Sequence, residues 1–192
     1  NAGGFDSAAA ALEAGAASAD LLVRRDQIPR VNAHKPIDSV AWLKHFADLD
    51  DATRWRLMVH VMRNNQPPPQ DTFDRAASLP GFRMREGAGI TAAYMANDEV
   101  IVETAAGDTL HADFVIAATG FANDFSLRVE TSEIADKIAL WRDCYTPPEG
   151  EDWEPMGTYP YLGKSFEFVE KTPGAAPWLH HIHCFSLGTK PS

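Results

Sequence analysis

The first 25 residues, NAGGFDSAAAALEAGAASADLLVRR, constrain the possible folds of this chain more than any other stretch. Small residues at 1–4 predict a turn, and the alanine-rich stretch from Phe5 to Ala14 predicts a helix that Gly15 ends. An apolar strand is expected from Ala19 to Val23, directly before two arginines. A helix that follows glycine offers free N–H groups and a partial positive charge beside accessible backbone, which suits a bound anion.

The same stretch matches the second half of the G-x-G-x-x-G pattern of dinucleotide-binding βαβ units. Gly4 takes the third glycine position and Asn1 the second, so the first glycine and its strand are expected before residue 1. Ala2, Gly3 and Gly4 then form the predicted pyrophosphate turn. The alternative interpretation is an ordinary alanine-rich amphipathic helix followed by a strand, because half of the glycine pattern is absent.

The residues that follow the strand bear on which nucleotide is bound. NAD-binding units usually carry an acidic residue there for the ribose 2′-OH, whereas an arginine accommodates the 2′-phosphate of NADP. Arg24 and Arg25 occupy this place and favour NADP, although Asp26 follows them directly. The alternative is that both arginines are simply solvated at the end of a strand.

Composition excludes several classes of partner. The 192 residues carry a net charge of −10, which argues against nucleic acid as a partner. The longest apolar runs, such as Phe114 to Ala118, are far too short to span a bilayer, so no membrane partner is expected. Cys144 and Cys184 are the only cysteines and form no CxxC pair, which fits a reducing cytoplasm and provides no redox dithiol.

The middle of the chain changes from helical to strand periodicity. Helices are expected from Asp38 or Ser39 to about Asp48, after Asp50 or Asp51, and at 71–78, with a proline-rich break between the last two. From about residue 82 to 112, four short alternating segments separated by turn residues predict an antiparallel meander, with strands at 82–86, 89–96, 100–104 and 109–111. A buried strand is expected next, at 113–118.

That strand ends in the most specific motif of the chain, DFVIAATGF at 113–121. This motif, together with the preceding order of elements, resembles the D-x-V-I-x-A-T-G-F segment of flavoproteins with two dinucleotide-binding domains. Within that group the chain is most similar to the flavin-containing and Baeyer–Villiger-type monooxygenases. The resemblance implies FAD and NADP as cofactors and places Thr119 and Gly120 near the flavin. Without it, the Thr-Gly pair is a tight strand-to-loop turn.

The resemblance also implies the fold, an α/β arrangement with a Rossmann-type parallel sheet, an inserted antiparallel meander and part of a second, FAD-type domain. Residues 1–120 are the expected NADP-binding domain, incomplete at its N-terminus, and residues 121–192 the incomplete FAD-type portion. In such families NADPH reduces FAD and a flavin hydroperoxide oxygenates a small organic substrate. We therefore predict a fragment of an oxidoreductase of the monooxygenase type. No residue can be named as catalytic.

Two other functions remain open at this level. The chain could be a non-catalytic NADP(H)-binding module, or part of a pyridine-nucleotide-dependent flavoprotein reductase, although reductases of the disulfide class need a dithiol. The incomplete domains predict that these residues alone are inactive and hold flavin weakly. An unprotected sheet edge is also expected to favour a homodimer or pairing with a partner strand.

The last third of the chain is less regular. A helix is expected from Thr131 to Tyr145, followed by a long stretch rich in Pro, Gly and aromatic residues up to Gly163. The YPYLG segment at 159–163 fits either a substrate-channel wall or plain packing against a sheet. Near the end, three histidines and Cys184 suggest metal binding, but a strand there would send alternate residues to opposite faces, so no metal site is predicted.

Overall fold

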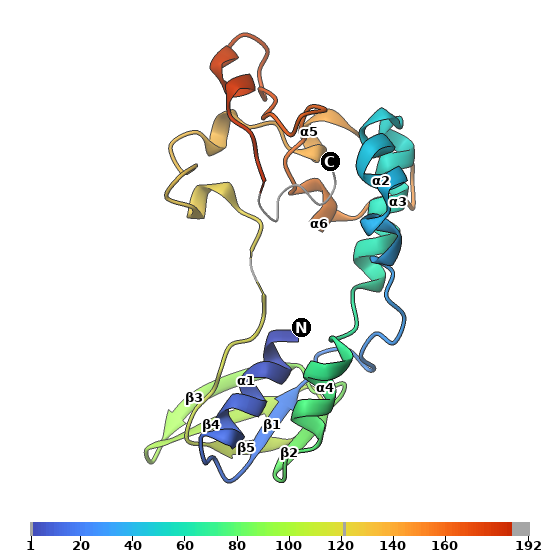
Figure 1. Ribbon diagram of the computed structural model, residues 1–192. Helices are drawn as coiled ribbons and strands as arrows, with labels where there is room; N and C mark the ends of the chain where they lie inside the picture. Colours follow the sequence, from blue (N-terminus) through green and yellow to red (C-terminus); the bar gives the residue numbers. More distant parts are fainter. Residues whose placement is uncertain (1, 121, 186–192) are drawn as a thin grey trace. The chain divides into compact units, whose positions relative to one another are not determined.

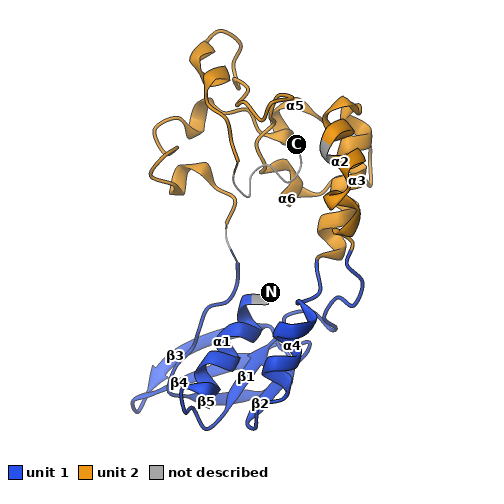
Figure 2. Ribbon diagram, viewed as in Figure 1, with its two compact units in different colours: residues 1–32, 66–120 blue, residues 33–65, 121–192 orange. Residues whose placement is uncertain are grey.

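The computed structural model describes residues 2–120 and 122–185, which form two compact units (Figure 2). The first unit contains residues 1–32 and 66–120, and the second contains residues 33–65 and 121–192. Each unit is therefore built from two separate stretches of chain. This grouping differs in residues 33–65 from the two-part division expected from the sequence.

The first unit combines a parallel and an antiparallel sheet, which confirms a mixed α/β fold. Strand β1 (Ala19–Leu22) pairs in parallel with β2 (Phe82–Arg85), and Ala19 lies opposite Phe82. The three-stranded antiparallel sheet has the order β3-β4-β5, with bounds Ile90–Ala96, Glu99–Thr104 and Thr109–Ala112. The predicted meander thus begins only at β3, because β2 pairs with β1. The Rossmann-type arrangement stays a prediction.

Two helices cover the parallel pair, and Figure 1 shows them side by side, α1 (Ala2–Glu13) beside α4 (Gln70–Ala77). Their contact is apolar: Phe5, Ala9 and Ala76 are buried in one cluster. At the rim of this contact, the Arg75 guanidinium donates to the Glu13 carboxylate. Alanine at the helix–helix contact lets the two backbones approach while Phe5 fills the space above the sheet.

The segment that follows β5 differs from its prediction. Residues 113–118 form no strand, and Phe114, Val115 and Ile116 are 86%, 46% and 60% exposed. An apolar run becomes a strand only when a neighbouring strand receives its backbone hydrogen bonds, and within the described residues this segment has none. The predicted buried strand at 113–118 is therefore wrong for this structure.

The second unit opens with two capped helices. Ser39 accepts a hydrogen bond from the Trp42 amide at the start of α2 (Val40–His45), and Asp50 accepts one from the Thr53 amide at the start of α3 (Asp51–Asn64). Short 3-10 turns flank α2: η1 (Lys35–Asp38) and η2 (Phe46–Asp48). The sequence predicted both helices and both capping regions correctly.

The rest of the second unit consists of short elements joined by isolated bridges. The predicted helix at 131–145 is wrong: this stretch contains η4 (Ala135–Lys137), bridges at Ile138 and Leu140, and the single turn α5 (Trp141–Cys144). Further short helices are η3 (Phe125–Leu127), α6 (Glu154–Gly157) and η5 (Pro177–His181). Ile138 pairs with Glu170, and Leu140 pairs with Pro160. These two bridges keep the backbone extended here.

The buried residues of this unit form two clusters. One joins Phe46, Trp55, Met58 and Val59 from the helical stretch to Trp141 and Met156. The other surrounds Phe125, Ile138 and Phe168. Tertiary burial of Trp141, which is fully buried, thus stabilises a helix too short to persist alone.

The histidines near the end do not lie on the expected strand. His180 and His181 are part of η5, and His183 forms a bridge with Glu167, while residues 186–192 lie outside the described part. In the described ranges no three His, Cys, Asp or Glu side chains are grouped as a metal site would require. None of the helices described is both long and apolar enough to cross a membrane.

Candidate functional site

All seven residues predicted to bind cofactors lie in the first unit. Ala2, Gly3 and Gly4 belong to α1, so the expected turn at this point is instead the first helical turn. Gly4 is buried, and a Cβ added to it would lie 2.7 Å from Leu21 Cδ1 of β1. The absence of a side chain at Gly4 therefore allows α1 to lie close to the strand, which is the packing role of the third glycine in dinucleotide-binding units.

The arginine pair lies where β1 continues beyond its last regular residue. Pairing with the β2 segment extends through Val23 and Arg25, since the Val23 amide donates to the Arg85 carbonyl at 2.8 Å and the Gly87 amide donates to the Arg25 carbonyl at 2.7 Å. Both arginine side chains are exposed, and Gly89 lies beneath the Arg24 stem. The backbone is thus held firmly while both guanidinium groups face outward.

The start of α1 and the arginine pair lie at the same edge of the parallel sheet. A short turn joins the end of α1 at Glu13 to the start of β1 at Ala19, and α1 packs against β1, so the helix runs back along the strand. The positive end of the helix therefore lies on the side of the carboxyl end of β1. This is the edge at which open α/β sheets bind ligands.

Thr119 and Gly120 have a less defined environment. Both are exposed and belong to no helix or strand, and Gly120 has a φ of +89°, which a residue with a side chain rarely adopts. The nearby Ala118 approaches the position of a Gly4 Cβ to 3.6 Å. The structure thus brings Gly4, Leu21 and Ala118 together, and the flavin contact of Thr119 and Gly120 stays a prediction.

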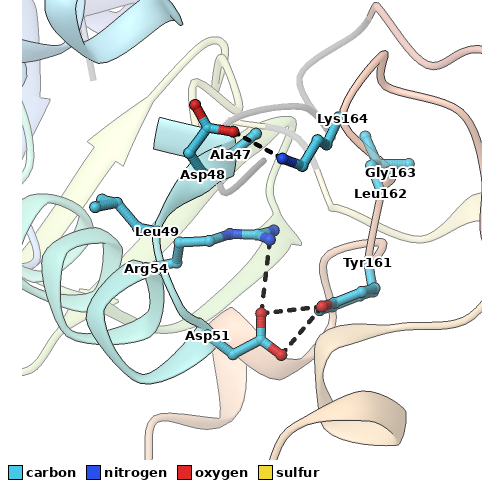
Figure 3. Close-up of a pocket in the computed structure, with 9 residues that line it drawn as sticks. All are labelled: Ala47, Asp48, Leu49, Asp51, Arg54, Tyr161, Leu162, Gly163 and Lys164. Atoms are coloured by element: carbon cyan, nitrogen blue, oxygen red, sulfur yellow. Dashed lines mark hydrogen bonds and ion pairs between the residues drawn. The ribbon is translucent and has the colours of Figure 1, made fainter. Parts of the chain in front are cut away.

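The second unit contains a pocket that the sequence did not predict, a half-open cavity of about 370 Å³ (Figure 3). The loop before α3 and the first turns of α3 form one side of it, and residues 161–164 form the other. Four of its lining side chains are charged: Asp48, Asp51, Arg54 and Lys164. Tyr161 lines it as well.

Arg54 is the unusual residue of this pocket, because its side chain is only 7% exposed. Its guanidinium carbon lies over the rings of Trp141 and Tyr161, at 4.7 and 5.4 Å from their centroids. Its polar contact is an ion pair of 3.6 Å between Nη1 and Asp51 Oδ1, one helical turn away. The buried Nε finds no acceptor among the described residues.

The Asp51 carboxylate is occupied by another donor. The Tyr161 hydroxyl lies 2.9 and 3.0 Å from the two carboxylate oxygens and donates its proton to them. Burial, and then the hydrogen bond to Asp51, raise the pKa of Tyr161 above its ordinary value. The phenol therefore stays protonated and keeps its donor role at neutral pH.

At the rim of the pocket a second pair is exposed to solvent. The Lys164 ammonium donates to Asp48 Oδ1 at 2.7 Å, and His45 Nδ1 lies 3.4 Å from Asp48 Oδ2. The hydrogen bond from Lys164, followed by that from His45, lowers the pKa of Asp48. Both carboxylates of the pocket thus have donors, whereas the buried Nε of Arg54 has no acceptor among the described residues.

Sequence reasoning treated the apolar residues of α3 as core, which is correct, but it missed Arg54. The available signal was the Asp51-x-x-Arg54 spacing, which places an acid and a base on one helix face, together with the aromatic residues around 153–161. In the YPYLG segment Pro160 and Leu162 are buried, and Tyr161, Leu162 and Gly163 line the pocket, while the choice between a substrate-channel wall and packing stays open.

Comparison with known proteins identifies a relative. No family model matches the chain, but the chain is 36% identical over 182 residues to the FAD-dependent urate hydroxylase of Xanthomonas campestris pv. campestris. The alignment covers 95% of this chain and 38% of the relative, so the chain spans less than half of that protein's length. The predicted resemblance to flavin-dependent monooxygenases is thereby confirmed.

A solved structure is also similar: the reduced form of an ornithine hydroxylase from Pseudomonas aeruginosa. It matches 80% of this chain and 37% of its own chain, at 15% identity and a TM-score of 0.48. The conclusions that follow rest on the sequence similarity to the urate hydroxylase and not on this structural similarity.

Proposed function

From its relationship to a flavin-dependent hydroxylase, we propose that this chain is part of an FAD-dependent, NADPH-using oxidoreductase of the monooxygenase type. The observation that carries the proposal is the 36% identity over 182 residues. The substrate is a small organic molecule, and urate is the first compound to test because the relative acts on it. A reducing cytoplasm is the proposed location, in keeping with the cysteine usage.

The residues of the first unit fit the nucleotide. Gly4 keeps α1 close to β1, so the amides of the first helical turn, including those of Ala2 and Gly3, would face the pyrophosphate. Arg24 and Arg25 would hold the 2′-phosphate, since both are exposed on a backbone fixed by hydrogen bonds to the β2 segment. These residues bind and orient the nucleotide.

For FAD, the support is the relative's stated dependence and the position of Thr119 and Gly120 in the ATG motif. Flavin supplies oxygen-activating redox chemistry when it is bound. Because Thr119 and Gly120 are exposed and irregular, the contribution of this chain to flavin binding is small. We therefore expect these residues alone to bind NADPH measurably and FAD weakly.

The test is a titration of the 192-residue chain with NADPH and NADH. The proposal predicts tighter binding of NADPH, and the doubly substituted Arg24→Ala, Arg25→Ala chain should lose about ten- to hundredfold in NADPH affinity with NADH unchanged. Arg30→Ala is the matched control, because Arg30 is an exposed arginine of the same unit outside the predicted site.

Equal loss of NADPH and NADH affinity would mean that the arginines do not recognise the 2′-phosphate. An intact mass with a visible spectrum of the same sample completes the test. Stoichiometric flavin on a chain of 21.0 kDa would contradict weak FAD binding by these residues.

A further inference from the structure

We propose that the Arg54 pocket of the second unit binds a small planar organic anion through two coplanar oxygens of a carboxylate. This inference is independent of the proposed function, because the predicted nucleotide-binding residues all lie in the first unit. It rests on the environment of one buried cation and on the number of donors and acceptors around it.

The first observation is that Arg54 is buried without a full set of acceptors. A guanidinium has five N–H donors, and burying donors without partners costs free energy. Of these donors, the described residues engage only Nη1, in a 3.6 Å ion pair, while Nε has no acceptor. A side chain that is 7% exposed in this state is poised to gain from an acceptor.

The second observation concerns the direction from which an acceptor can approach. Trp141 and Tyr161 contact each other, with ring centroids 5.0 Å apart, and lie on one side of the guanidinium. The N–H donors of a guanidinium lie in its plane, so an acceptor must approach along that plane. A carboxylate presents two oxygens in one plane and fits such a fork, whereas a neutral amide presents one acceptor and two competing donors. The geometry therefore selects a carboxylate over a neutral analogue.

The third observation is that each acid of the pocket has a donor other than Arg54, although Asp51 also forms the 3.6 Å ion pair with Arg54. Asp51 accepts the Tyr161 hydroxyl and Asp48 accepts the Lys164 ammonium (Figure 3). Lys164 is exposed at the rim and can reorient toward a bound anion. The cavity of about 370 Å³ has room for a single-ring carboxylate.

The experiment follows the arginine Nε–H signals of the ¹⁵N-labelled 192-residue chain during titration with benzoate. One signal, assigned to Arg54 by its loss in Arg54→Lys, should shift and saturate with a Kd on the order of 1 mM. Benzamide, the neutral analogue, should leave that signal in place, and inorganic phosphate should bind about tenfold more weakly than benzoate.

Variants separate the pocket from a general charge effect. Arg54→Lys keeps the charge but loses the planar fork, so benzoate binding followed by ligand-observed NMR should weaken about tenfold. Arg56→Lys is the control, since Arg56 is an exposed arginine on the same helix. Should Arg54→Lys fail to fold, two variants that leave the core intact test the pocket instead. Lys164→Met removes the rim cation, and Tyr161→Phe removes the donor that competes with Arg54 for Asp51, so each should weaken binding several-fold.

Three results would overturn the proposal: an Arg54 signal that does not move, equal responses to benzoate and benzamide, or a concerted shift of all arginines. Stronger binding of phosphate than of benzoate would also contradict it, because a tetrahedral anion would then be the better ligand.

Discussion

Gly4 packs against β1 so closely that position 4 accepts no side chain without movement of Leu21. Valine at this place would overfill the contact between α1 and the parallel sheet. We expect Gly4→Val to destabilise the first unit by about 1–3 kcal/mol. Hydrogen exchange with mass spectrometry of peptides from α1 and β1 measures the effect in the unit concerned.

Gly3→Ala is the matched control for this prediction, because Gly3 is exposed in the same turn of the same helix. Alanine favours a helix over glycine, so exchange in α1 should stay the same or slow down. Equal destabilisation by Gly3→Ala and Gly4→Val would show that the helix start tolerates no substitution at all, rather than that Gly4 is required for close packing.

The ion pairs of Asp20 should make the stability of the parallel strand pair depend on pH. Its carboxylate accepts hydrogen bonds from Arg83 on the facing strand, at 3.0 and 2.7 Å, and from Arg85 at 2.8 Å. The Arg83 hydrogen bond is the main reason that the pKa of Asp20 is lowered from its ordinary 3.8. A lowered pKa in the folded state means that the ion pairs stabilise above pH 3.8 and are lost as the pH falls through the lowered pKa.

We therefore expect Asp20→Asn to cost about 1 kcal/mol at pH 6, a modest value because Arg83 is half exposed. The difference between variant and parent should shrink as the pH falls from 6 to 3. Thermal unfolding followed by circular dichroism at several pH values measures this. A difference that is constant with pH would mean that the asparagine acts through packing and not through lost charge.

Individual residues with a local role were predictable from the sequence. Ser39 and Asp50 were expected to cap helices and do so, because a cap needs only its own side chain and an amide three residues later. Arg54 was not predictable, because its burial depends on Trp141 and Tyr161, about 90 and 110 residues further along the chain.

At the scale of elements, the segment at 113–118 shows that apolar composition alone does not make a strand. Its apolar residues satisfy the composition of a buried strand, yet a strand also requires a neighbour for its amides and carbonyls. The helix prediction at 131–145 is wrong for a related reason. Ile134, Ile138 and Trp141 have helical spacing, but Ile138 pairs with Glu170 in a β-bridge, which keeps its backbone extended. Elements whose partners are local in sequence, such as β3 to β5, were predicted well.

The exposed segment leads to a prediction about association. Phe114 and Ile116 present apolar surface that a second copy or a partner strand could cover, as the homodimer hypothesis requires. We expect Phe114→Ser with Ile116→Ser to reduce self-association and to change stability by less than about 0.5 kcal/mol. Light scattering over a range of concentrations, combined with thermal unfolding, tests both parts.

Ile101→Ser is the comparison for this pair, because Ile101 is buried in β4 and its replacement should destabilise the unit strongly. If the double variant lost as much stability as Ile101→Ser, the segment at 113–118 would be packed in solution. If it associated as readily as the parent chain, the exposed apolar side chains would not be the surface responsible.

For the molecule as a whole, the stretch at 33–65 decides where a stable piece can be cut. It lies between two segments of the first unit along the chain, but it packs in the second unit. Phe46, Trp55 and Met58 share a buried cluster with Trp141 and Met156. A polypeptide ending at residue 120 would therefore expose this cluster to water.

We expect the polypeptide 1–120 to aggregate and to bind a dye specific for apolar surface. The same polypeptide with residues 33–65 replaced by a flexible linker of about ten residues should not aggregate, should bind less dye and should keep its NADPH affinity, because the predicted nucleotide-binding residues lie outside the deleted stretch. Size-exclusion chromatography and dye fluorescence compare the two. A monomeric 1–120 that binds no dye would show that α2 and α3 are stable without Trp141, and the division of the chain at residue 120 would then be the better description of its folding units.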